Sequence, residues 1–310
     1  MKTVVTITMN PAIDKSTGVE VVAPEIKLRC GAPRFEPGGG GINVSRALRE
    51  LGGSSTALYT SGGYSGKLLE SILNSEGIDH RPVRVDEMTR INLIVRETST
   101  GKQYRFGMPG QPLAEEEWRK CLEMLRTVEP RPEFIVASGS LPPGVPEDFY
   151  AMVADAGGEI GAKTIVDTSG EPLRRVARKG VFMIKTNLRE FGLLTGLEIK
   201  NNEELMSAAT DVVEKGSAEV LVVSLGAEGA FGAWKEGNIY IASPEVPVRS
   251  AVGAGDSMVA GIVLKLAMDK SVEEALLMGV AAGAAAAMTA RSELCREEDA
   301  MKLYRQMLEG

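Results

Sequence analysis

The sequence Val252-Gly253-Ala254-Gly255-Asp256-Ser257-Met258-Val259-Ala260-Gly261 decides how the rest of this chain is interpreted. Two glycines bracket an alanine, an acid follows, and an apolar run continues to Leu266, which predicts a small-residue turn that enters a helix. The first amides of a helix have no partners inside it, and the helix dipole places partial positive charge there. Glycine lets a ligand approach the backbone closely, so this turn fits a phosphate group.

Asp256 allows two interpretations within this turn. A carboxylate competes with an anionic ligand, so its position makes sense for a base that removes a proton from a hydroxyl beside the phosphate. Asp is also a common cap of helices, and this stretch alone favours the cap.

Composition limits the classes of protein that the chain can represent. It has 310 residues, of which 25% are charged and 44% hydrophobic, which predicts one large α/β domain, alone or with a small appendage. The net charge of −7 argues against a non-specific nucleic-acid binder. Cys30, Cys121 and Cys295 are far apart and form no CxxC motif, so a zinc site or disulfide framework is not expected. We interpret the single histidine, His80, as a bystander in an exposed connection.

The chain shows no signal-peptide pattern and no apolar run long enough to span a membrane. The longest uncharged run, 275–290, is mostly Ala and Gly and predicts a buried helix that packs closely against a neighbour. We therefore expect a cytoplasmic protein without membrane or nucleic-acid partners.

Strand and helix patterns alternate along most of the chain, which predicts an α/β fold with a mostly parallel sheet covered by helices on both faces. The run Val220–Leu225 is almost entirely apolar, as expected of a strand covered on both faces. The predicted strands are 3–9, 56–59, 134–136, 164–167, 181–185 and 220–225, followed by two shorter ones. The predicted helices are 67–76, 115–126, 146–156, 172–178, 188–195 and 203–215, and three more start at 257, 272 and 297.

Two segments break this alternation. Residues 15–37 and the hairpin formed by 91–97 and 102–106 predict short strands that pair into a small separate sheet. We therefore divide the chain into a core (1–13, 38–88 and 107–310) and a β-sheet lid (14–37 and 89–106). The lid's exposed strand edges predict a homodimer in which two lids pair.

Further glycine-bearing turns and basic residues suggest sites for anions. Four glycines in Pro37–Leu48 run into a predicted helix, which indicates a ligand against the backbone, a flexible hinge, or both. Ser224–Gly229 is another such turn at a strand end. Four basic residues lie in the lid, namely Lys27, Arg29, Arg90 and Arg105. Each alone is most simply a solvated charge, but together they favour an anion clamp. Neither a Walker A motif nor GxGxxG is present.

These motifs resemble the PfkB branch of the ribokinase-like carbohydrate kinases over essentially the whole chain. Gly39–Ser45 is similar to the family's first glycine signature and Val252–Gly261 to its Gly-Ala-Gly-Asp signature. Thr8–Asp14 and Ser138–Gly144 resemble the subgroup that phosphorylates hexose phosphates. Relatives that act on fructose 1-phosphate or tagatose 6-phosphate usually carry Lys where this chain has Gly40, so the minor 6-phosphofructokinases of bacteria are more similar.

The resemblance implies ATP-dependent phosphorylation of fructose 6-phosphate at its C1 hydroxyl, giving fructose 1,6-bisphosphate. It implies that Asp256 is the base and that the amides of Gly253, Ala254 and Gly255 hold the developing charge. It assigns the sugar hydroxyls to Asp14, Gly39 and Asn43, and the sugar phosphate to Lys27, Arg90, Arg105 and either Ser138 or Ser140.

The resemblance also implies a nucleotide site and ions. It assigns the ATP phosphates and ribose to Lys185, Asn187, Ser224, Gly226 and Gly229, and the adenine to Val280, Gly283 and Ala284. Asn187 and Glu190 resemble a motif that organises Mg²⁺ through water. Some members bind K⁺ through carbonyls that correspond to the region of Ser250, Val252 and Ala286, which the sequence neither supports nor excludes.

Other activities stay open at this point. A 1-phosphofructokinase or tagatose-6-phosphate kinase would use the same mechanism. A kinase of unphosphorylated sugars or nucleosides is opposed by the basic lid. A catalytically silent sugar-phosphate sensor is opposed by the intact Asp256.

Overall fold

The computed structural model describes residues 1–289 and 293–309, and nine strands in this part form the central sheet. Their order is β13-β12-β11-β10-β9-β8-β1-β4-β5, in which β11 through β5 run parallel while β12 and β13 each pair antiparallel with the preceding strand. The strands are β1 (Val4–Thr8), β4 (Thr56–Ser61), β5 (Asp79–Arg84), β8 (Phe134–Ser138), β9 (Lys163–Asp167), β10 (Val181–Asn187), β11 (Ala218–Ser224), β12 (Gly229–Trp234) and β13 (Gly237–Ala242).

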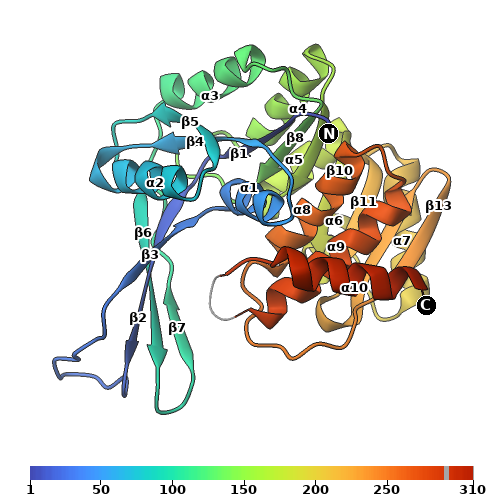
Figure 1. The fold of residues 1–310 in the computed structure, drawn as a ribbon. Helices are drawn as coiled ribbons and strands as arrows, with labels where there is room; N and C mark the ends of the chain where they lie inside the picture. Colours follow the sequence, from blue (N-terminus) through green and yellow to red (C-terminus); the bar gives the residue numbers. More distant parts are fainter. Residues whose placement is uncertain (290–292, 310) are drawn as a thin grey trace.

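Helices cover both faces of this sheet (Figure 1), because side chains along a buried strand alternate between its faces. In β1, Val4 packs into one core whereas Val5 and Ile7 pack into the other. The first core includes α1 (Gly40–Glu50), α8 (Ala254–Ala267), α9 (Val272–Met288) and α10 (Glu297–Glu309). The second includes α3 (Glu115–Thr127), α4 (Phe149–Glu159), α5 (Gly170–Lys179), α6 (Leu188–Thr195) and α7 (Asn202–Glu214), while α2 (Gly63–Ser75) packs in a third cluster. The predicted fold class is confirmed.

A second sheet has the order β3-β2-β6-β7 and projects away from the central sheet (Figure 1). Its strands are β2 (Ala12–Val19), β3 (Arg34–Gly38), β6 (Arg90–Glu97) and β7 (Gln103–Phe106). β2 pairs with β6 in parallel, so the segments on either side of the first helices come together. The predicted pairing of these two segments into a small separate sheet is confirmed.

The two faces of the small sheet differ in chemistry. Lys15 of β2 pairs with Phe35 of β3 and with Leu93 of β6, and Leu93 pairs with Phe106 of β7. The side chains of Phe35, Leu93 and Phe106 therefore share one face of the sheet. On that face Phe35, Ile91 and Phe106 are 39%, 40% and 48% exposed. Asp14 pairs with Asn92 on the opposite face, which is polar.

The prediction for His80 is wrong in part. Residues 79–84 are not an exposed connection but the edge strand β5, which pairs in parallel with β4. His80 is partly buried there, and its Nδ1 lies 3.0 Å from the Tyr59 hydroxyl. Pro82 hides the strand pattern in the sequence, since proline is tolerated in a strand mainly at a sheet edge.

Two helix starts also differ from the prediction. α4 begins at Phe149 because Pro146 instead belongs to the turn whose carbonyl accepts the Phe149 N–H. α8 begins at Ala254 and not at 257, so Asp256 lies inside its first turn.

The run 275–290 lies largely in α9, which is buried against α8 as expected. A Cβ on Gly261 of α8 would lie 2.6 Å from the carbonyl oxygen of Met278, and one on Gly279 of α9 would lie 2.5 Å from Ile262 Cγ1. The two helices approach so closely that no side chain fits at either position. The small residues of this region therefore have a structural cause.

We expect Gly261→Ala to destabilise the protein by about 1–3 kcal/mol, because the added methyl group overpacks the α8–α9 contact. The control is Gly158→Ala in α4, where a Cβ would meet nothing within 4 Å. That variant should gain about 0.5–1 kcal/mol from helix propensity alone. Urea unfolding measures both, and equal effects of the two substitutions would contradict the close contact.

Candidate active site

Asp256 lies in the first turn of α8 but does not cap the helix. The N-cap position is Gly253, in the left-handed conformation with φ of 77°, and no side chain caps the helix there. A Cβ on Gly253 would also meet Leu294 Cδ2 at 2.8 Å, so glycine is required. The cap interpretation of Asp256 is therefore wrong, and its carboxylate is available for other contacts.

The Asp256 carboxylate is bound by α1. Asn43 Nδ2 donates a hydrogen bond of 2.9 Å to Asp256 Oδ2, which joins the first turns of α1 and α8. The two glycine signatures of the sequence, far apart in the chain, thus meet at one point. Asn43 faces the carboxylate directly.

A buried ion pair lies beside this carboxylate. Lys185 Nζ is 3.3 Å from Asp167 Oδ2, and the two side chains are only 8% and 15% exposed. A Cβ on Gly255 would lie 3.0 Å from the same ammonium, so Lys185 contacts the turn that precedes Asp256. Sequence analysis missed Asp167, although it directly follows the buried run Thr164–Val166, and open α/β sheets bind ligands beyond the carboxyl ends of their strands.

These contacts change the protonation of both groups. Burial raises the pKa of Asp256 to about 6, and the Asp167 charge adds to this, while Asn43 and Lys185 oppose it. Burial works to lower the pKa of Lys185, but the charges of Asp167 and Asp256 outweigh it and raise that pKa. The site therefore combines a carboxylate that titrates near neutral pH with a permanent cation, which suits proton removal beside an anion.

The polar face of the small sheet adds Asp14 to this region. Asn92 Nδ2 donates to Asp14 Oδ1 at 2.8 Å, and Asn92 Oδ1 accepts the Met108 N–H at 3.0 Å. A Cβ on Gly38 would lie 2.8 Å from Asp14 Oδ2, so glycine makes room for the carboxylate. Asn92 was also missed, because a polar residue within a strand pattern carries no signal of its own.

Arg90 ties together the connections between the two sheets. Its guanidinium donates to the carbonyls of Asn10 at 3.0 Å and Met108 at 2.9 Å, with a longer contact to Pro11. Asn10 Nδ2 in turn donates to Ser140 Oγ at 3.0 Å. Ser140 is exposed, whereas Ser138 is buried.

The glycines of the first signature contact protein atoms. A Cβ on Gly39 would lie 2.7 Å from Thr8 Cγ2, and one on Gly40 would lie 2.2 Å from Ser138 Oγ. Close contact with other parts of the chain therefore explains these two glycines without a ligand. Any side chain at position 40 would require Ser138 to move.

Within the part of the chain that the structure describes, two predicted anion ligands, Lys27 and Arg105, make no hydrogen bond or ion pair with this region. Lys27 is exposed in the connection between β2 and β3, which lies at the far end of the small sheet (Figure 1). Arg105 is exposed on β7 and pairs with Ile94, which pairs with Ser16. Since Ser16 is two residues from Asp14 on β2, Arg105 lies on the same face of the small sheet as Asp14.

The predicted nucleotide residues gather at the carboxyl ends of β10 and β11. Asn187 is paired with Ser224, and Ser224 Oγ donates to the Thr186 carbonyl at 3.1 Å. Gly226 follows in a short 3₁₀ turn, and a Cβ on Gly229 would collide with the Ile241 carbonyl. Val280, Gly283 and Ala284 lie on α9, where a Cβ on Gly283 would be 3.3 Å from the Ala254 carbonyl, so this face of α9 borders the first turn of α8.

Asn187 and Glu190 form a reciprocal cap of α6. The Asn187 N–H donates to Glu190 Oε2 and the Glu190 N–H to Asn187 Oδ1, both at 2.9 Å. Among residues 1–289 and 293–309 no three His, Cys, Asp or Glu side chains cluster as a metal site. The arrangement fits an ion that keeps most of its water, as Mg²⁺ does.

The predicted K⁺ ligands come together, but not all are free. The Ser250 N–H donates to the Ala287 carbonyl, which places Ser250 beside the end of α9. Ser250 Oγ accepts the Val252 N–H at 3.2 Å. The Ala286 carbonyl already accepts two hydrogen bonds from Thr289, so a cation there would have to displace one.

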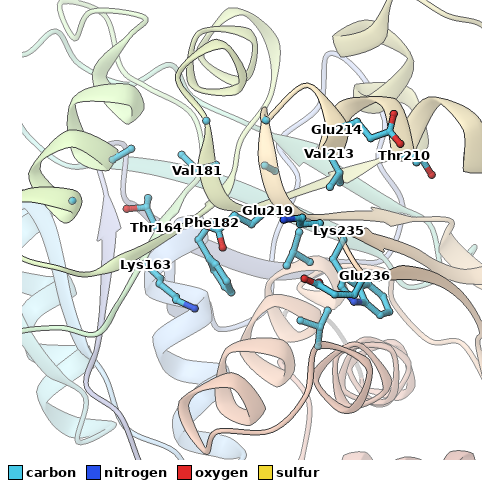
Figure 2. Close-up of a pocket in the computed structure, with 18 of the residues that line it drawn as sticks. Lys163, Thr164, Val181, Phe182, Thr210, Val213, Glu214, Glu219, Lys235 and Glu236 are labelled. Atoms are coloured by element: carbon cyan, nitrogen blue, oxygen red, sulfur yellow. The ribbon is translucent and has the colours of Figure 1, made fainter.

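A hollow of about 970 Å³ lies at the opposite end of the parallel strands, where β9, β10 and β11 begin (Figure 2). Its lining includes Lys163, Phe182 and Trp234, and Lys163 Nζ lies 4.4 Å from the centre of the Phe182 ring. None of the predicted site residues lines it. The site built on Asp256 instead follows the rule that open α/β sheets bind ligands beyond the carboxyl ends of their strands.

A family model described as pfkB family carbohydrate kinase matches residues 2–299. The chain is 42% identical to ATP-dependent 6-phosphofructokinase isozyme 2 of Escherichia coli K12 over 98% of both chains. It is 42% identical to the same isozyme of Mycobacterium tuberculosis over 97% of this chain and 88% of the relative. A 1-phosphofructokinase of Bacillus subtilis is 32% identical over 96% of both chains.

Solved structures of E. coli phosphofructokinase-2, at 41% identity, cover 99% of this chain and 100% of theirs. They include a complex with fructose-6-phosphate (TM-score 0.94), a complex with potassium (0.95) and a tetrameric inhibited form (0.94). A ribokinase from Thermotoga maritima has a TM-score of 0.77 at 19% identity and shares the fold. The described residues include no helix long and apolar enough to cross a membrane.

Asp256→Asn is expected to stabilise the folded protein at neutral pH. Because the pKa of Asp256 is raised from 3.8 to about 6, folding disfavours the ionised form, and above pH 6 the wild type bears this penalty. The variant escapes it and gains about 1–2 kcal/mol after allowance for partial exposure to solvent. The gain shrinks as the pH falls from about 6 toward 4, because the wild-type group then becomes neutral in the folded state.

Urea unfolding at several pH values measures this gain. Glu123→Gln, which removes one exposed negative charge from α3, is the control. A gain from Asp256→Asn that does not depend on pH would contradict the raised pKa.

Proposed function

Since the chain belongs to the pfkB family of carbohydrate kinases, we propose that it is an ATP-dependent 6-phosphofructokinase. The observation that carries the proposal is Asp256, a carboxylate in the first turn of α8 that is held by Asn43 and has Lys185 beside its turn. The identity of 42% to isozyme 2 of E. coli and M. tuberculosis, against 32% to a 1-phosphofructokinase, supports the choice of fructose 6-phosphate.

In the proposed reaction Asp256 removes the proton from the C1 hydroxyl of fructose 6-phosphate. The C1 oxygen then bonds to the γ-phosphorus of ATP, the bond to the β–γ bridging oxygen breaks, and ADP leaves. The amides of Gly253, Ala254 and Gly255 and the Lys185 ammonium face the charge that develops on the transferred group. Donors of this kind are each worth about 3–4 kcal/mol in the transition state.

The sugar phosphate is proposed to lie between the central and small sheets. Asp14, Gly39 and Asn43 bind its hydroxyls, while Arg90, Arg105 and Ser140 or Ser138 bind its 6-phosphate. The exposed Ser140, linked through Asn10 to Arg90, favours Ser140 over the buried Ser138. A lysine at position 40, as in other subgroups, would require Ser138 to move, so this arrangement is matched to glycine, which supports 6-phosphofructokinase activity.

ATP is proposed to lie along the ends of β10 and β11. Its phosphates and ribose contact Lys185, Asn187, Ser224, Gly226 and Gly229, and its adenine lies near Val280, Gly283 and Ala284. Asn187 and Glu190 hold hydrated Mg²⁺, which offsets the charge of the phosphates when bound. For K⁺ at Ser250, Val252 and Ala286, the engaged Ala286 carbonyl does not fit, and no step depends on that ion.

The first experiment measures ADP release with Mg·ATP on fructose 6-phosphate, fructose 1-phosphate, tagatose 6-phosphate, fructose and ribose. We expect the highest kcat/KM on fructose 6-phosphate. Asp256→Asn should lower kcat by roughly 10²-fold or more, as loss of a general base does, while sugar-phosphate binding persists and Glu123→Gln has no effect.

Each other outcome has a distinct meaning. Preference for fructose 1-phosphate or tagatose 6-phosphate would contradict the subgroup. Activity only on free sugars would contradict the anion-binding lid. No activity with retained binding would favour a sugar-phosphate sensor, and normal turnover by Asp256→Asn would remove Asp256 from the mechanism.

The small sheet is proposed to act as a lid (14–37 and 89–106) and to pair with the lid of a second chain. The exposed side chains of Phe35, Ile91 and Phe106 on its apolar face support this, since two such faces can cover each other. Lys27 belongs to the connection between β2 and β3, and this connection lies at the far end of the sheet (Figure 1), so we propose that Lys27 contributes only in the assembled dimer.

Phe106→Asp should therefore dissociate the dimer, because it places a charge in an apolar interface. Leu308→Asp, at an exposed apolar residue of α10, should not. Analytical ultracentrifugation measures the mass of both variants. An unchanged mass for Phe106→Asp would contradict pairing through this face and point to another surface, such as one used in tetramers.

A further inference from the structure

Two carboxylates act on Lys185, and only one of them belongs to the proposed reaction. Its ammonium is 3.3 and 3.4 Å from the two oxygens of Asp167, the residue that ends the neighbouring strand β9. The negative charge of Asp256 also acts on it. If Asp167 holds the ammonium, Asp256 stays free to act as the base.

The strand register favours Asp167. Ile184 pairs with Val166 across β9 and β10, so the residues that follow, Lys185 and Asp167, lie side by side at the carboxyl edge of the sheet. The ammonium extends from there to Gly255, where a Cβ would lie only 3.0 Å away. It is thus held between Asp167 and the backbone turn that precedes Asp256.

The lengths of these contacts also matter. Distances of 3.3 and 3.4 Å are longer than those of strong charge-assisted hydrogen bonds, which are about 2.7–2.9 Å. An ammonium has three N–H donors, so Lys185 can face both Asp167 oxygens and still offer a donor elsewhere. The ion pair with Asp167 therefore restrains the Lys185 ammonium and leaves an N–H donor available for another partner.

We propose that Asp167 is a positioning residue, which holds the Lys185 ammonium against the Gly255 turn, ready for the transferred phosphoryl group, and keeps it from pairing with Asp256. This inference rests on the proposed function of the same site. Asp167 itself touches neither the substrate nor the reacting atoms. It acts through Lys185.

The test is Asp167→Asn, which keeps the shape of the side chain and removes its charge. We expect kcat to fall roughly 10- to 100-fold, by analogy with the loss of groups that orient the ligands of metal sites, with a smaller change in KM for the sugar phosphate. Asp167→Glu, which restores the charge at a different length, should recover part of the loss. Glu76→Gln breaks the partly buried pair with Arg46 and is the control, with unchanged kcat.

A double-mutant cycle separates positioning from mere structure. If Asp167 acts through Lys185, the variant Asp167→Asn with Lys185→Met should be no slower than Lys185→Met alone. Additive losses would overturn the proposal. Restoration of kcat in Asp167→Asn by excess Mg²⁺ would also overturn it, because Asp167 would then act as a metal ligand.

The variants are assayed on whichever substrate of the panel the wild type phosphorylates fastest. Failure on fructose 6-phosphate alone would then overturn the substrate assignment and leave the comparison of variants intact. A wild type that phosphorylates none of them would overturn both proposals. Thermal unfolding of each variant establishes that it is folded, and Asp167→Glu carries the test if Asp167→Asn is not.

Discussion

Two carboxylates share one lysine at the carboxyl edge of the central sheet, and the chemistry of the site depends on how that charge is divided. The ammonium of Lys185 contacts Asp167, and among the described residues no such ion pair compensates the charge of Asp256. Burial and the neighbouring acid therefore disfavour the ionised form of Asp256 and raise its pKa to about 6. A base that is neither fully quenched nor permanently ionised is suited to a proton transfer near neutral pH.

The fold brings Asp167, Lys185 and Asp256 together. Parallel strands place Asp167 and Lys185 at the same edge, and the first turns of α1 and α8 point at that edge from one face of the sheet. Glycine at 261 and 279 lets α9 pack closely against α8, the helix that carries Asp256. The helices that carry the two signatures are thus fixed by packing before any ligand binds.

The sequence predicted the parts of this structure that leave a periodic pattern. Alternation of apolar strands and amphipathic helices gave the fold, and the small sheet followed from two segments that broke the alternation. The edge strand β5 was missed because Pro82 and His80 interrupt its pattern, and Asp167 because its partner is distant in sequence. The stretch around Asp256 alone favours a cap, whereas the family resemblance predicts a base. The local pattern misleads because the start of α8 depends on Gly253 and its contact with Leu294, which no local pattern reveals.

The glycines of the signatures are also required by contacts within the protein. Gly40 and Gly229 were linked to ligands, yet a Cβ there would collide with Ser138 Oγ or with the Ile241 carbonyl. Their first constraint is therefore contact between segments of the protein. Such contacts bring backbone amides to a fixed place without intervening side chains, and fixed amides are what an anion in a transition state requires. Folding and catalysis thus demand the same residues, so a glycine motif can identify a family without each glycine touching a substrate.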